Sequence, residues 1–252
     1  MSDNNITELY GALSKFLSAI SPAIDYVREL DASLTDLKQA TGASDEELKQ
    51  LFIDSENIAK GINTTTKEII NQTTWWKNLG YNIKDAQTLA KNTSILSALS
   101  PGLSTEKAAS SLLNTIKAFE LEPVNSLDSV ISKINTTGQN IGLSNTGITD
   151  VLSQTSSAMA EAGNTLDETI ALGASAMKIT GSADTASDIL NNITGNIQDN
   201  SPVISELTKT PDMPDGISLF TDETNETYNT TYRILSDIAS VWEQLDSGRQ
   251  KS

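Results

Sequence analysis

Apolar residues recur in the first part of the chain at alternating intervals of three and four residues. Sustained spacing of this kind indicates a helix that buries a narrow seam against another helix. Pro22 lies within the pattern and removes one backbone donor, so it predicts a kink or a restart, with two helices over about 4–20 and 22–40. The pattern fits a coiled coil and an ordinary bundle helix equally well. The stripe consists of Ile6, Leu9, Leu13, Phe16, Ile20, Ala23, Val27, Leu30, Leu34 and Leu37.

Capping signals mark the starts of the helices that follow. Ser44 precedes Glu47 by three residues, the spacing of a capping box in which each residue bonds the backbone N–H of the other. The acidic cluster Asp45, Glu46 and Glu47 also suits the positive end of a helix dipole. A second helical stretch is expected over about 45–79, with a break near 61–66, where Gly61 and three threonines weaken it.

An internal repeat organises the middle of the chain. Gly80 and Gly142 each precede a predicted helix and lie 62 residues apart, and Gly102 and Gly163, which follow those helices, lie 61 apart. A Ser or Thr two residues after each of these last two glycines can cap the next helix. Each unit therefore predicts a helical hairpin, and a further helix over about 124–141 joins the two units.

The helical pattern fades after Leu190. Three prolines and two glycines punctuate 191–219, which predicts loops or short helices. A last helix is expected over about 224–245, with one apolar face. That face consists of Tyr228, Tyr232, Leu235, Ile238, Val241, Trp242 and Leu245.

These patterns predict an all-α protein, an elongated helical bundle of repeated helical hairpins preceded by a helix with a heptad pattern. The expected organisation is N-terminal amphipathic helices over 1–41, a helical core with the duplication of about 61 residues over 42–190, an irregular linker over 191–220 and a C-terminal helix over 221–252. Only 37% of the 252 residues are apolar and 5% are aromatic, which favours narrow apolar stripes over one thick core.

Charge and composition exclude several classes of function. The formal net charge of −16 disfavours direct binding to nucleic acids and to anionic membrane surfaces. Without cysteine or histidine the chain has no thiolate nucleophile and lacks the commonest general base and transition-metal ligand. It also lacks a signal peptide pattern and an apolar run long enough for a membrane segment.

We expect no catalytic, cofactor-binding or metal-binding residues and therefore no enzyme. Three consecutive carboxylates such as Asp45, Glu46 and Glu47 point around a helix rather than at one ion, so capping explains them better than a metal site. A hydrolase with a carboxylate pair would need two such groups about 5–10 Å apart across a cleft. Most carboxylates here lie in first helical turns or on polar faces, where helix capping explains them without a catalytic role.

Four stretches in order resemble the tail tape-measure proteins of bacteriophages and prophages. The first, from Val27 to Lys38, resembles the amphipathic helix ahead of the conserved core of that family. The second, from Ala108 to Phe119, is a Leu-rich helix that ends in Ala-Phe. The third, from Thr165 to Leu172, resembles the most recognisable run of the family, and the fourth, from Thr231 to Ala239 with Trp242, resembles the helix after it.

The resemblance covers about 25–246 and implies a structural protein that lies inside the tail tube, sets tail length during assembly and is released at DNA ejection. It implies the tail tube protein, tail assembly chaperones and tail tip proteins as partners, and a location in the tail lumen of the virion and, during assembly, in the cytoplasm of the bacterial host. The heptad pattern of the N-terminal helix also predicts that the chain associates with other copies of itself. The alternative is a stand-alone helical module for protein–protein interaction, such as a secreted effector or an adaptor.

Overall fold

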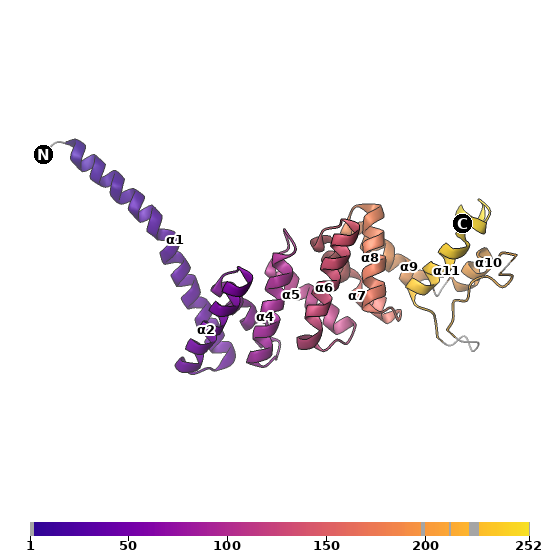
Figure 1. Ribbon diagram of the computed structural model, residues 1–252, viewed down its shortest axis with the longest axis horizontal. Helices are drawn as coiled ribbons and strands as arrows, with labels where there is room; N and C mark the ends of the chain where they lie inside the picture. Colours follow the sequence, from indigo (N-terminus) through magenta and orange to yellow (C-terminus); the bar gives the residue numbers. More distant parts are fainter. Residues whose placement is uncertain (1–2, 198–199, 212, 222–226, 252) are drawn as a thin grey trace. The chain divides into compact units, whose positions relative to one another are not determined.

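The structure is a computed structural model that describes residues 3–197, 200–211, 213–221 and 227–251. Within these ranges it is all-α, with eleven α-helices, two short 3₁₀ helices and no β-strand, which confirms the predicted fold class (Figure 1). The chain divides into two compact units, residues 1–95 and 96–252. The domain boundaries expected from the sequence stay predictions.

The first unit is built on α1 (Asp3–Thr41), α2 (Asp45–Ile62) and α3 (Thr66–Asn78), followed by most of α4 (Ile83–Ala98). The second half of α1 packs against α3, and α2 packs against α3 as well. Their shared core contains the buried side chains of Leu37, Leu51 and Ile70. Trp76 is also buried, and its indole N–H donates to the Thr93 hydroxyl at 3.0 Å.

The predicted restart at Pro22 is wrong, because α1 runs through this proline as one helix (Figure 1). Proline leaves the carbonyl of Ser18, four residues earlier, without its helical N–H partner. Ser18 and Pro22 are both exposed, so water can bond that carbonyl and the helix continues. The break predicted near 61–66 is confirmed, since α2 ends at Ile62 and α3 begins at Thr66.

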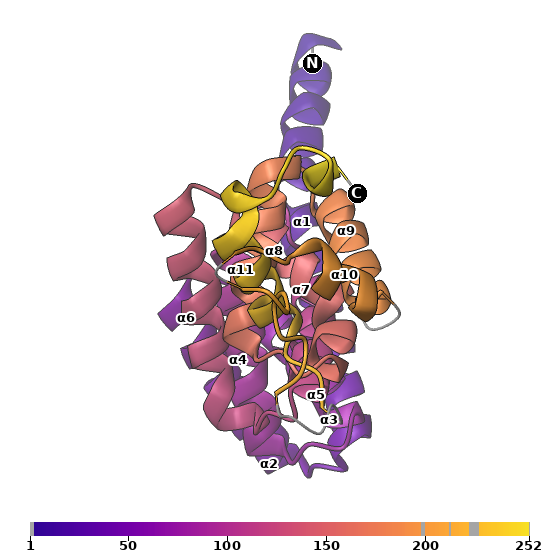
Figure 2. The same ribbon diagram turned by 90° about the vertical axis from the view of Figure 1, so that its right-hand side faces the viewer.

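The second unit contains α5 (Thr105–Ala118), α6 (Pro123–Ile141), α7 (Asn145–Glu161), α8 (Leu166–Thr180) and α9 (Ala183–Asn196). In this unit α7 is the central helix, in contact with α5, α6, α8 and α9 (Figure 2). The capping box predicted at Ser44 is present, and the cap predicted at Thr165 is also a capping box, with Glu168 three residues on. Gly142 and Gly181 end α6 and α8 in the left-handed conformation.

The helices of the two predicted repeats begin at similar intervals. The starts of α4 and α7 lie 62 residues apart, those of α5 and α8 lie 61 apart, and those of α6 and α9 lie 60 apart. This regularity favours a duplicated three-helix segment. The duplication itself stays a prediction.

The C-terminal part of the second unit has a core of its own. Residues 191–220 contain the end of α9, α10 (Ser201–Leu207) and irregular chain, with Pro202 in the first turn of α10. This segment is more than a connection, because Ile197, Ile217 and Leu219 are buried together with Ile234 and Val241. Two isolated β-bridges, Thr210 with Met213 and Phe220 with Tyr228, hold the irregular chain.

The final helix is shorter than expected and buries only part of the predicted apolar face. It is α11 (Thr231–Val241), followed by the 3₁₀ helices Trp242–Gln244 and Arg249–Lys251. Positions 224–226 of the predicted helix lie outside the described residues, and 227–230 are not helical because Tyr228 pairs with Phe220 and the Thr230 side chain caps α11. Ile234 is buried, whereas Tyr232 is 38% and Trp242 is 45% exposed, so the predicted apolar face is wrong at these two aromatic positions.

Candidate interaction surfaces

The acidic cluster at the start of α2 is occupied in capping and ion pairing. The Ser44 backbone N–H donates to Glu47 at 2.9 Å, and this bond lowers the pKa of the Glu47 carboxyl. Lys38 Nζ lies 2.5 Å from Asp45 Oδ1 and lowers the pKa of Asp45. Across the described ranges no group of three or more His, Cys, Asp or Glu residues is placed to hold a metal ion.

Two carboxylates, Glu106 and Asp150, line one hollow of about 310 Å³ in the second unit. Burial raises the pKa of the Asp150 carboxyl, Lys107 opposes this effect and Asp184 adds to it. The remaining lining residues are Lys107, Gln154 and three serines, so the hollow itself offers no aromatic platform for a sugar ring. The hollow is therefore a polar depression between α5 and α7, without the apolar walls typical of small-molecule sites.

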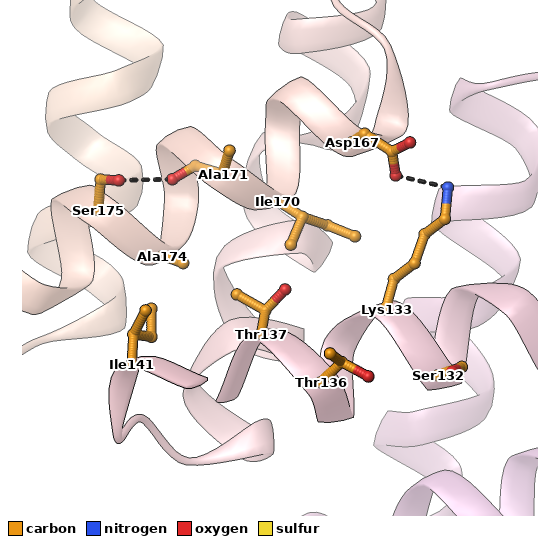
Figure 3. A pocket seen from close by; sticks show the side chains of 10 residues that line it. All are labelled: Ser132, Lys133, Thr136, Thr137, Ile141, Asp167, Ile170, Ala171, Ala174 and Ser175. Atoms are coloured by element: carbon orange, nitrogen blue, oxygen red, sulfur yellow. Dashed lines mark hydrogen bonds and ion pairs between the residues drawn. The ribbon is translucent and has the colours of Figure 1, made fainter. Parts of the chain in front are cut away.

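A larger groove of about 510 Å³ runs between α6 and α8 (Figure 3). The side chains of Ile170 and Ala174, both nearly inaccessible to solvent, contribute its apolar part. The α6 side is lined by Ser132, Lys133, Thr136, Thr137 and Ile141, and the α8 side by Asp167, Ile170, Ala171, Ala174 and Ser175.

Polar contacts join the two helices at both ends of this groove. At one end Lys133 Nζ lies 2.5 Å from Asp167 Oδ1, as Figure 3 shows. At the other end Lys178 Nζ donates to the carbonyl oxygen of Ile141 at 2.5 Å, at the negative end of the α6 dipole. Between these contacts, Thr136 and Thr137 of α6 face Ile170 and Ala174 of α8 across the groove.

The sequence contained a signal for this groove that the periodicity analysis did not use. Ala171, Ala174 and Ser175 have the spacing i, i+3 and i+4, which places three small side chains on one face of a helix. Small side chains leave room beside a neighbouring helix. Which helix lies there, and how far away, depends on tertiary packing and could not be predicted from the sequence.

The second candidate surface is an exposed apolar part of α1 between Leu17 and Val27, where Leu17 and Ile24 lie beside the heptad stripe that contains Val27. Val27 is 62% exposed, Leu17 is 53% exposed and Ile24 is 45% exposed. The same stripe is covered further along the helix, where Leu30 and Leu34 are partly buried and Leu37 is buried. Between Leu17 and Val27, α1 thus presents apolar side chains that the described part of the chain leaves accessible.

No helix in the described residues is both long and apolar enough to cross a membrane. Ion pairs are found mostly on the surface, as between Arg233 and Asp237 at 2.9 Å or Lys60 and Glu56 at 2.8 Å. Such exposed pairs contribute little to stability.

Comparison with known proteins identifies a family for most of the chain. The model of the phage-related minor tail proteins matches residues 55–252. No curated protein and no solved structure matches the chain. The match begins within α2 and includes every helix from α3 to α11, the groove between α6 and α8 among them. The chain therefore belongs to the family of phage-related minor tail proteins.

Proposed function

We propose that this protein acts as a tape measure, a structural component that sets the length of the tail during assembly and leaves the tail tube when DNA is ejected. The observation that carries the proposal is the family match over 55–252, together with the four stretches that resemble tape-measure proteins in the same order. The helical fold also favours it, because a helix has a fixed rise per residue and can serve as a ruler.

The surface chemistry is compatible with a temporary place in a tail tube. With a net charge of −16, the chain is repelled by the phosphates of DNA that follows the same path. Ser, Thr and Asn side chains make up much of the remaining polar surface and form exchangeable hydrogen bonds with water. In this proposal the partners are the tail tube protein, tail assembly chaperones and tail tip proteins. The protein is located in the tail lumen and, during assembly, in the host cytoplasm.

A change in the length of the gene tests the proposal directly. Duplicating residues 145–196, which span α7 to α9, adds 52 residues in frame. If this segment lies in the tail as a continuous helix, the tail should lengthen by about 80 Å at 1.5 Å per residue. If its helices stack side by side at about 10 Å each, the increase should be roughly 30 Å.

Tail lengths are read by electron microscopy of negatively stained phage particles. A matched control carries recoded DNA for 145–196 without the duplication, and removal of the same segment should shorten the tail. Normal tails of unchanged length after both the duplication and the removal would rule out a tape measure. That result would favour the alternative, a stand-alone helical interaction module.

A further inference from the structure

We propose that the C-terminal segment, the described residues from 200 to 251, unfolds as a separate unit while the bundle of α5 to α9 stays folded. A polar layer of three buried side chains, Asn164, Thr194 and Thr231, lies where this segment meets the bundle. Opening at this layer would give the chain a defined end from which it can extend. The proposal concerns how the fold comes apart and does not depend on whether the protein measures tail length.

Two separate apolar cores lie on successive stretches of α9. Ala186 and Leu190 are buried with Val151 of α7 in the bundle. Further along the same helix, Ile193 and Ile197 belong instead to the core of the C-terminal segment, with Ile217, Leu219, Ile234 and Val241. The two clusters share no side chain, so the C-terminal core can be lost without exposing the other.

The contacts of the polar layer are hydrogen bonds. The Thr231 hydroxyl donates to the Thr194 hydroxyl at 3.4 Å, which in turn donates to the Met159 sulfur at 3.3 Å. Asn164 Nδ2 donates to the Met159 carbonyl at 2.9 Å, and Asn164 Oδ1 accepts from the backbone N–H of Tyr232 at 2.9 Å. Such bonds add little net stability, because water replaces them once the segment has opened.

An apolar residue occupies the position of Asn164 in the first predicted repeat. Leu103 directly precedes the residue that caps α5, as Asn164 directly precedes the residue that caps α8, and both side chains are buried. The turn before such a helix therefore accepts a leucine. The asparagine is needed for its bond to Tyr232, the first contact between the bundle and α11.

Packing is also looser at the polar layer than inside the bundle. Within the bundle α7 and α8 approach closely, since a Cβ added at Gly173 would lie 2.8 Å from Val151 Cγ1. Where the bundle meets the segment there is instead a hollow of about 400 Å³, and surfaces beside an unfilled space lose dispersion contacts. The hollow is lined by Glu161, Ala162, Gly163 and Ile197 on the bundle side and by Thr227, Tyr228, Asn229 and Thr231 on the other.

Hydrogen bonds within the C-terminal segment hold its distant parts together. Arg249 Nη1 donates to the Lys209 carbonyl at 2.6 Å, which joins the end of the chain to the residues after α10. Asn229 Nδ2 donates to the Ser218 carbonyl at 3.0 Å, and the Ile217 backbone N–H donates to the hydroxyl at the end of α10 at 3.0 Å. The segment should therefore open as one unit rather than fray residue by residue.

Hydrogen–deuterium exchange of the full chain, followed by mass spectrometry at increasing urea concentrations, tests the proposal. After correction for intrinsic rates, the amides of α11 should exchange at least about tenfold faster than those in the middle of α7, with a weaker dependence on urea because less surface opens. The amides of Ile217 and Asn229 should share the rate of α11. Equal rates and equal urea dependence for α7 and α11 would overturn the proposal, as would separate rates within the segment.

Asn164→Leu should widen this difference, because the Tyr232 N–H loses its acceptor while the turn before α8 accepts a leucine. Exchange of α11 should accelerate by about tenfold, and exchange of α7 should not change. Asn145→Leu is the matched control, since Asn145 Nδ2 donates to the Leu99 carbonyl at 2.8 Å and makes no contact with the segment. Equal acceleration of α11 in both variants would contradict a role for the polar layer.

The double variant Thr194→Val with Thr231→Val should have the opposite effect. It replaces both partners of a buried hydrogen bond by apolar side chains of the same shape, which joins the two apolar cores. Exchange of α11 should slow by about threefold or more, toward the rate of α7. Exchange as fast as in the wild-type chain would show that the polar layer does not separate the two units.

Discussion

The part of α1 from Leu17 to Val27 and the central helix α7 differ in which side chains they bury. In α1, apolar side chains such as Leu17 and Val27 are more than half exposed. In α7, the polar side chains of Thr149, Thr155 and Ser156 are all within 1% of complete burial. Apolar side chains are therefore exposed on α1, while α7 buries polar side chains beside apolar ones such as Leu152.

This difference in burial arises from the number of helices that pack against each of the two. Four helices surround α7, whereas the α1 side chains described in the core with α2 and α3 begin at Leu30. Burial of polar side chains in α7 is tolerated because a hydroxyl can bond within its own helix. Thr155 donates to the carbonyl of Val151 at 2.8 Å, and Ser156 to that of Leu152 at 2.6 Å. Periodicity shows which face of a helix can be buried, and the number of adjacent elements decides whether it is.

The largest difference between α1 and α7 is expected when an apolar side chain is truncated and the free energy of unfolding is measured. Leu152 in α7 is 2% exposed, so Leu152→Ala should leave a cavity and lower the free energy of unfolding by about 2–5 kcal/mol. Val27→Ala in α1 should change it by less than about 0.5 kcal/mol, because the Val27 side chain is 62% exposed. Urea denaturation followed by circular dichroism measures both. A loss above 2 kcal/mol for Val27→Ala would mean that the stripe is covered within the monomer.

A smaller effect should distinguish the buried hydroxyls of α7 from one another. The Thr149 hydroxyl is buried without a hydrogen-bond partner in the described part of the chain, and an unpaired buried polar group is destabilising. Thr149→Val should therefore raise the free energy of unfolding by about 1 kcal/mol. Thr155→Val removes a hydroxyl that is bonded to Val151, so it should give no increase. Equal changes in the two variants would show that the bond within the helix does not matter.

Much of the fold could be predicted because its signals are local. The predicted capping box at Ser44 and the predicted cap at Thr165 depend on residues at most three positions apart, and both form. The helix ends near Ile62 and Ala118 follow from local breaks and caps in the same way. Pro22 and Tyr228 were misjudged because solvent exposure and pairing with Phe220 decide the structure there, and neither is a local property.

The two candidate surfaces also differ in whether their sequence signals are local. The stripe on α1 was evident from spacing alone, since one helix contains all of its residues. The groove between α6 and α8 was missed because it needs Thr137 and Ala174, which are far apart in sequence, on the two sides of one space. The polar contacts that bound it, Lys133 with Asp167 and Lys178 with Ile141, also join separate helices. Only tertiary packing brings these residues together.

The smallest expected effect on stability comes from removing the charge of an aspartate. Its sign should be opposite at Asp150 and at Asp45. Burial in α7 raises the pKa of Asp150, so its ionised form is less stable in the folded than in the unfolded chain. This penalty is present above the raised pKa and disappears as the pH falls below the usual value of an aspartate. Asp150→Asn should therefore raise the urea midpoint slightly at pH 7 and leave it unchanged near pH 3.

Asp45 provides the opposite case, because the Lys38 ammonium lowers its pKa. Its contribution to stability is present above the usual pKa of an aspartate and is lost as the pH falls through the lowered value. Asp45→Asn should therefore lower the urea midpoint at pH 7, and the difference from the wild-type chain should vanish in acid. Parallel urea titrations of both variants at the two pH values measure these differences. A decrease at pH 7 for Asp150→Asn would mean that its interaction with Lys107 outweighs burial, and the polar residues of α7 would then stabilise the core through charge as well as through hydrogen bonds.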